Sequence, residues 1–196
     1  MKKNKVITLI VTIVCAISLA SCDNQPNYMP KPRGYFRIDL PEKSYSEVDT
    51  IGRYRFECPT YAFTTNDPYS PEEENWVNIE MPEFKSSIHL THKNINGNLS
   101  EYLEDVHVML TKHLQKANGI RDSLIINDDH HVYGLLIEMD GKAVATPIQF
   151  YLTDSTSNFV RGALYFNFKP DNDSLQPVIN FIREDIDHLI NTFEWK

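Results

Sequence analysis

The feature that most restricts what this chain can fold into is a series of three alternating apolar runs, which lies between two helical patterns. Apolar and polar side chains that alternate with a period of two are typical of strands, because successive side chains point to opposite faces. The predicted strands are residues 132–139, 142–153 and 158–168. Asp140-Gly141 between the first two is a type I′ hairpin signal. The three runs therefore predict an antiparallel meander.

The first helical pattern precedes the meander and covers residues 98–117. Its apolar side chains recur every three or four positions, as on one face of an amphipathic helix. Asn98 and Glu101 have the spacing of a capping box at its start. Asn118-Gly119 is expected to end the helix in a left-handed cap.

The second helical pattern follows the meander and runs to Phe193. It is predicted to open near Asp173, whose side chain can cap the helix while Gln176 reaches back. Pro177 is expected in the first turn, where its missing amide hydrogen costs nothing. Glu184-Asp185 is expected on the polar, solvated face.

Shorter β-type pieces precede both helices, and an acidic, proline-containing loop at residues 67–75 divides them. The predicted pieces are residues 53–58, 61–65, 76–81 and 85–92, with a hairpin around Pro82. The order of elements predicts an α+β domain: an antiparallel β-sheet with a three-stranded C-terminal meander and two packed helices. This arrangement resembles a PsbP/Mog1-like sandwich, in which a C-terminal helix returns across the sheet.

The first 21 residues are predicted to be a lipoprotein signal peptide. A short basic start is followed by an apolar run at residues 6–19, which is shorter than a usual membrane span. The closing Leu19-Ala20-Ser21-Cys22 resembles the bacterial lipobox. Cleavage between Ser21 and Cys22 would make Cys22 the first residue of the mature chain. The thiol of Cys22 is the atom that takes a diacylglyceryl group. Two or three acyl chains, palmitate among them, then suffice for stable anchoring in a lipid bilayer.

Charge and cysteine content exclude several classes of protein. The whole chain has a net charge of −8, which becomes −11 when the three lysines of the signal peptide are removed. Such acidity argues against a nucleic-acid-binding surface, which needs clustered Lys and Arg. With Cys15 removed and Cys22 acylated, Cys58 is left alone, so the mature chain cannot form an intramolecular disulfide. Cys58 is expected to be a buried core residue rather than a reactive thiol.

Residues 22–45 are predicted to be the acylated cysteine and a proline-rich tether, and residues 46–196 a single α+β domain. The tether concentrates basic and aromatic side chains in an otherwise acidic protein. The candidates for a partner-binding strip are Lys31, Arg33, Tyr35, Phe36 and Arg37. Two interpretations remain open and are compatible: a segment docked on the domain by its apolar side, or a partner contact, since Tyr and Arg are enriched at binding hot spots.

The segment from Tyr28 to Pro41, YMPKPRGYFRIDLP, together with the lipobox and the C-terminal NTFEW, resembles the gliding-motility lipoprotein D family (GldD). The resemblance covers nearly the whole chain, and the Pro-rich Arg-Gly-Tyr-Phe-Arg run is its specific part. It implies a role in surface gliding and in the type 9 secretion machinery coupled to gliding. It implies no catalytic residues. It also implies a lipid-anchored place in the cell envelope, at the outer membrane facing the periplasm.

No motif for catalysis or for a cofactor accompanies this resemblance. The seven histidines lack a His-Glu-x-x-His pattern, and the chain has neither a nucleophile elbow nor a phosphate-binding glycine loop. We therefore expect no metal, no cofactor and no enzymatic activity. Three tripeptides resemble an O-glycosylation acceptor of gliding bacteria: Asp49-Thr50-Ile51, Asp122-Ser123-Leu124 and Asp173-Ser174-Leu175.

Two hypotheses of function follow. In the first, the chain is a non-enzymatic, lipid-anchored component or stabilising partner of the gliding and secretion machinery, and it contacts other envelope proteins. In the second, it is a periplasmic ligand-binding or enzymatic lipoprotein that uses a pocket between helix and sheet. A deep cleft lined by convergent polar groups would favour the second, and a filled sheet–helix core would not.

Overall fold

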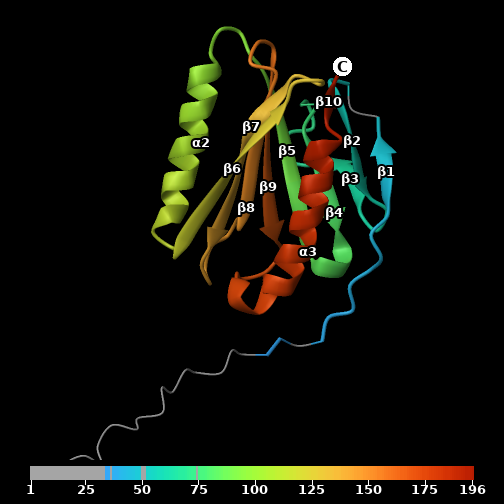
Figure 1. Ribbon diagram of the computed structural model, residues 1–196, viewed down its shortest axis with the longest axis vertical. Helices are drawn as coiled ribbons and strands as arrows, with labels where there is room; N and C mark the ends of the chain where they lie inside the picture. Colours follow the sequence, from blue (N-terminus) through green and yellow to red (C-terminus); the bar gives the residue numbers. More distant parts are fainter. Residues whose placement is uncertain (1–33, 36, 50–51, 74) are drawn as a thin grey trace, which may run out of the picture. The chain divides into compact units, whose positions relative to one another are not determined.

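A computed structural model describes residues 34–196 apart from residues 36, 50–51 and 74 (Figure 1). The chain divides into two units, residues 1–36 and residues 37–196. The lipobox, most of the tether and Thr50 lie outside the described residues. The second unit holds all of the helices and strands considered below.

A seven-stranded antiparallel sheet forms the centre of the second unit, with the strand order β3-β4-β5-β9-β8-β7-β6. Its strands are β3 (Phe63–Asn66), β4 (Val77–Met81), β5 (Ser86–Asn94), β6 (Gly119–Asn127), β7 (Val132–Asp140), β8 (Ile148–Thr153) and β9 (Asn158–Phe166). Strands β7, β8 and β9 are the predicted meander, which is confirmed. The hairpin around Pro82 is confirmed as well: β4 and β5 pair through the short 3₁₀ helix η1 (Pro82–Phe84).

A second, three-stranded sheet has the order β1-β2-β10, with β2 (Tyr54–Pro59) in the centre. Its outer strands, β1 (Tyr45–Val48) and β10 (Glu194–Trp195), do not appear among the predicted elements. Strand β10 has only two residues, and its partner lies more than 130 positions earlier in the chain. Neither fact is visible in a local pattern.

Two helices cover opposite faces of the seven-stranded sheet: α2 (Leu99–Leu114) and α3 (Asn172–Asn191) (Figure 1). The chain is therefore α+β with antiparallel sheets, as predicted. Helix α3 supplies a long apolar stripe to the main core, where Ile182 and Ile186 are fully buried against the sheet. Helix α2 buries only Val106, which packs with Ile95 and Phe159 in a smaller cluster.

Close approach between strands explains one glycine of the main core. Phe150 of β8 pairs with Gly162 of β9, and the ring lies over the glycine backbone. A Cβ atom at position 162 would lie 2.1 Å from Cζ of Phe150. The absence of a side chain at this position is therefore what lets the aromatic ring fill the space beneath α3.

The prediction of a two-residue type I′ turn between β7 and β8 is wrong. Strand pairing ends at Glu138↔Ile148, so residues 141–147 form a loop in place of a two-residue type I′ turn, and the strand predicted over residues 142–153 starts only at Ile148. The loop carries Val144 into the cluster around Ile137 and Met139. Burial of this valine on the α2 side of the sheet outweighs the local turn preference of Asp140-Gly141.

Both helix boundaries also differ from the prediction. Helix α2 ends at Leu114, and Gly119 begins strand β6 instead of capping the helix. Helix α3 begins at Asn172, so Pro177 lies in the second turn rather than the first. The reason is tertiary: the Asn172 side-chain amide donates to the carbonyls of Gly141 and Val144, both at 2.9 Å, and fixes an earlier start.

Candidate functional site

The first candidate site is the point where the last residues of the tether meet helix α3. The Lys43 ammonium lies 2.6 Å from Oδ1 of Asp185 and donates to the Phe181 carbonyl oxygen, also at 2.6 Å. The same ammonium lies 3.4 Å from the centroid of the Phe181 ring. Lys43 thus binds α3 through a charge pair, a hydrogen bond and a cation–π contact.

Two tyrosine hydroxyls complete the surroundings of Asp185. Tyr45 donates to Oδ1 at 2.9 Å, and Tyr61 donates to Oδ2. Asp185 is only 2% exposed, so its charge depends on these donors and on Lys43. We call the four residues Lys43, Tyr45, Tyr61 and Asp185 the Asp185 cluster.

Burial and the neighbouring carboxylate change the acid–base properties around this cluster. Burial, followed by the hydrogen bond to Asp185, raises the pKa of both Tyr45 and Tyr61 above the usual value for tyrosine. Burial and the charge of Asp185 also raise the pKa of the Cys58 thiol to about 11. Cys58 is a buried free thiol, as expected from the sequence. The two tyrosine hydroxyls therefore stay protonated, and remain donors to Asp185, at neutral pH.

A stacked pair of aromatic rings lies beside the Asp185 cluster. The Tyr45 ring lies 3.6 Å from the His188 ring with an interplanar angle of 15°. Nε2 of His188 lies 2.6 Å from Oε2 of Glu57 on β2. Strand β1 is therefore attached to the body by side chains from α3 as well as by its antiparallel pairing with β2.

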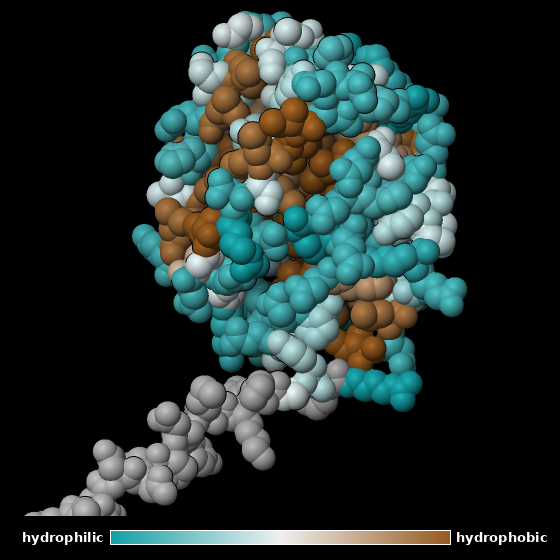
Figure 2. All heavy atoms as spheres, viewed as in Figure 1, coloured by the Kyte–Doolittle hydropathy of each residue, from teal (hydrophilic) through white to brown (hydrophobic). Residues whose placement is uncertain are grey.

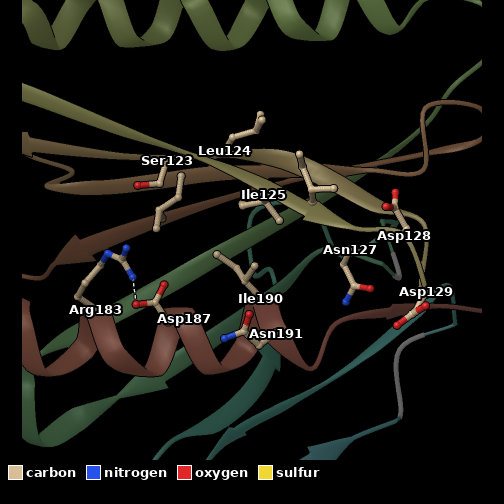
Figure 3. A pocket seen from close by; sticks show the side chains of 12 residues that line it. Ser123, Leu124, Ile125, Asn127, Asp128, Asp129, Arg183, Asp187, Ile190 and Asn191 are labelled. Atoms are coloured by element: carbon tan, nitrogen blue, oxygen red, sulfur yellow. Dashed lines mark ion pairs between the residues drawn. The ribbon is translucent and has the colours of Figure 1, made fainter.

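The second candidate site is a groove of about 530 Å³ between β6 and α3, which we call the β6–α3 groove (Figure 3). Ile125 on β6 and Ile190 on α3 point toward one another across it, and Leu124 points away from α3 (Figure 3). Asp128 and Asp129 lie at one end. At the other end Arg183 pairs with Asp187 and, at 3.2 Å, with Glu138.

Comparison with known proteins gives one decisive match: the family model described as gliding motility lipoprotein GldD matches residues 25–195. The chain belongs to the GldD family. It is accordingly a lipoprotein associated with gliding motility, anchored at a membrane of the cell envelope.

Two further comparisons add little. The search of curated proteins gives no match. Among solved structures, the solution structure of cyanobacterial PsbP (CyanoP) from Synechocystis sp. PCC 6803 is similar at a TM-score of 0.47 and 14% identity. That likeness covers 82% of this chain and 98% of the PsbP chain. Its level is too low to support an argument about function.

In this GldD family member, the structure describes two residues of the predicted partner-binding strip, Tyr35 and Arg37. Tyr35 is 54% exposed, and the exposed Arg37 side chain pairs with its neighbour Asp39 at 3.1 Å. Next along the chain, Ile38 packs against the main core. Ser21, Cys22, Lys31, Arg33 and Phe36 lie outside the described residues.

Two of the three predicted glycosylation residues, Ser123 and Ser174, are described, and they lie on different elements. Ser123 is exposed in the middle of β6 and lines the β6–α3 groove. Ser174 is exposed in the first turn of α3, where its amide donates to the Asp171 carbonyl oxygen. Thr50 lies outside the described residues.

The sequence pattern did not predict the Asp185 cluster, because it placed Asp185 on the solvated face of a helix. That expectation is wrong, because Asp185 is buried beneath Lys43 and the two tyrosines. The available signal was weak: Asp185 lies beside Ile182 and Ile186, so it borders the apolar stripe of α3.

Within the described residues, no group of three or more His, Cys, Asp or Glu side chains could hold a metal ion. No described helix is long and apolar enough to cross a membrane.

Proposed function

We propose that this GldD family member is a non-enzymatic component or stabilising partner of the gliding motility and type 9 secretion machinery. It acts by contact with other envelope proteins while the acylated Cys22 holds it in a lipid bilayer. The outer membrane, on its periplasmic side, is the proposed location. Family membership supports the association with gliding, and the arrangement of residues 35–45 supports action by contact.

The observation that carries the proposal is a division of roles along the C-terminal part of the tether. Lys43 and Tyr45 are bound to the body through Asp185, and Ile38 packs against the core. Tyr35 and Arg37, by contrast, expose their side chains. Exposed tyrosine and arginine side chains next to a fixed attachment point are well suited to bind a partner, since little mobility is lost on binding.

The test replaces the strip without shortening the tether. Lys31, Arg33, Tyr35, Phe36 and Arg37 are all changed to serine, and Ile38, Lys43 and Tyr45 are kept so that the segment still docks. We expect colony spreading and co-purification with other motility proteins to be lost, while the melting temperature of the purified protein stays unchanged.

The matched control is Tyr69→Ser, because Tyr69 is an exposed aromatic side chain elsewhere on the body. It should leave spreading and co-purification intact. Normal spreading of the serine-substituted strip would contradict the proposed contact. Lost spreading with a lowered melting temperature would assign the effect to folding instead.

The alternative, a ligand-binding or enzymatic lipoprotein, has less support. The interface between α3 and the sheet is filled by large apolar side chains, including Phe150, Leu152, Ile182 and Phe193. The β6–α3 groove lies at the edge of the sheet, and its polar groups are spread along its length rather than directed at one point. A packed interface with an edge groove favours a protein contact over a small-molecule pocket.

A further inference from the structure

Strand β6 is an open edge of the seven-stranded sheet. It pairs with β7 along its whole length, from Gly119↔Asp140 to Asn127↔Val132, without a bulge. Among the described residues, no strand pairs with its other side. A nine-residue strand therefore presents one side of its backbone donors and acceptors without a strand partner, which is a template for the addition of another strand.

Most of the usual protections of an edge strand are missing from the second half of β6. Natural edges are kept short or carry charged side chains, proline or a bulge. Strand β6 is nine residues long and has no lysine, proline or bulge, and its two charged residues, Arg121 and Asp122, both lie in its first half. The opposite edge of the same sheet, β3, is limited to four residues. The contrast indicates that β6 is an edge which the fold leaves available.

Apolar side chains accompany the open backbone. Leu124 is 72% exposed and Ile126 is 62% exposed, and Ile120 on the same face of β6 is also exposed. Figure 2 shows hydrophobic residues gathered on the face of the molecule where β6 lies in Figure 1. Alternate side chains of a paired strand would pack beside this row, as in known strand-addition complexes.

The charge near the open edge of β6 indicates which kind of segment can bind there. Asp128 and Asp129 follow the C-terminal end of β6 and are exposed. Within the described residues, neither carboxylate lies in an ion pair, whereas the basic Arg121 and Arg183 are already paired with Glu138 and other acids. The end of the groove at Asp128 and Asp129 is thus acidic and complements a basic segment.

We propose that the open edge of β6 binds an extended segment of a partner protein by strand addition. The segment pairs antiparallel, as do all strands of this sheet, alternates apolar and polar side chains, and carries lysine or arginine at its N-terminal end, next to Asp128 and Asp129. Antiparallel pairing is the more stable arrangement and places the N-terminus of the added strand at that end. The β6 edge shares no residue with the basic strip of the tether, so the two proposals are tested independently.

The test uses the full mature lipoprotein in detergent and a defined peptide. The probe is nine residues long: two lysines followed by alternating valine and threonine, with both ends blocked. One control peptide carries two glutamates in place of the lysines, and a second carries the lysines at its C-terminal end. Hydrogen exchange reads the protection of β6 amides, and fluorescence anisotropy reads affinity. We expect the lysine-first peptide to protect β6 and to bind at least tenfold more tightly than either control.

Substitutions in the protein assign the binding to this edge. Leu124→Asp places a charge in the apolar row and should weaken binding at least tenfold, without unfolding the protein because Leu124 is largely exposed. Leu114→Asp changes another exposed leucine, 46% against 72%, which lies on α2 and not on β6, and this variant should bind as the unsubstituted protein does. Exchanging Asp128 and Asp129 for lysine should reverse the preference, so that the glutamate peptide binds more tightly.

Three results would overturn the inference. The first is an absence of β6 protection with the lysine-first peptide. The second is equal weakening by Leu124→Asp and Leu114→Asp, which would mean that the apolar row is not the contact. The third is a dimer in sedimentation experiments that Leu124→Asp abolishes, since the occupant would then be a second copy of this chain. In each case the serine-substituted tether still tests the proposed function separately.

Discussion

Removing the charge of Lys43 tests the Asp185 cluster most directly. Lys43→Met keeps an unbranched apolar chain of similar length, so the contact with the Phe181 ring is largely retained. What is lost is the ammonium that lies 2.6 Å from both Asp185 and the Phe181 carbonyl oxygen. Asp185 would remain buried with two tyrosine hydroxyls as donors and no positive charge beside it.

The magnitude follows from the burial of the pair. Removal of one partner of a buried ion pair costs about 3–5 kcal/mol. The side chain of Lys43 keeps 23% exposure, and Asp185 keeps two hydrogen bonds, so we expect the lower end, about 3 kcal/mol. With a urea dependence of about 1–3 kcal/mol per molar, the midpoint of urea unfolding should fall by roughly 1–3 M.

A double-mutant cycle separates the pair from other effects. Asp185→Asn combined with Lys43→Met should destabilise by less than the sum of the two single changes, with a coupling of about 1–3 kcal/mol. The control is Lys93→Met, which removes a partly exposed ammonium that lies 4.4 Å from the centroid of the Trp76 ring and 3.9 Å from Glu73. This change should cost about 1 kcal/mol or less. If Lys43→Met costs no more than this control, the assigned role of the Asp185 cluster is refuted.

Three further expectations concern the core and its titratable groups. Gly162→Ala should cost about 1–3 kcal/mol in thermal unfolding, because its Cβ would collide with Phe150, whereas Gly34→Ala, with no neighbour within 4 Å, should be neutral. Burial raises the pKa of Tyr61, so its contribution to the free energy of unfolding is complete below pH 10 and declines above it. Tyr61→Phe should reduce the fall of urea-unfolding stability between pH 10 and 11, and Tyr45 and Tyr54, whose pKa values are also raised, should account for what remains. The Cys58 thiol, with a pKa of about 11, should react with a thiol reagent at pH 8 only when urea unfolds the chain.

Local patterns predicted the elements that bury one regular face. The C-terminal helix and the strands now seen as β7, β8 and β9 repeat apolar residues with the period of their own geometry, and each matches a real element. The same patterns failed for β6, because its sequence, GIRDSLIIN, exposes apolar side chains and does not follow a buried alternation. An edge strand with both faces largely open to solvent has little reason to carry the usual signal.

The sequence by itself therefore determined the α+β class, the meander, the two amphipathic helices and the buried Cys58, since each depends on residues close together in the chain. Only the tertiary structure decided that Lys43 meets Asp185 across more than 140 positions and that β6 forms an open edge. The physical reason is that both are relations between distant segments. A buried carboxylate is tolerated because folding brings its donors to it, and the edge at β6 is open because no other strand of the described chain pairs with it.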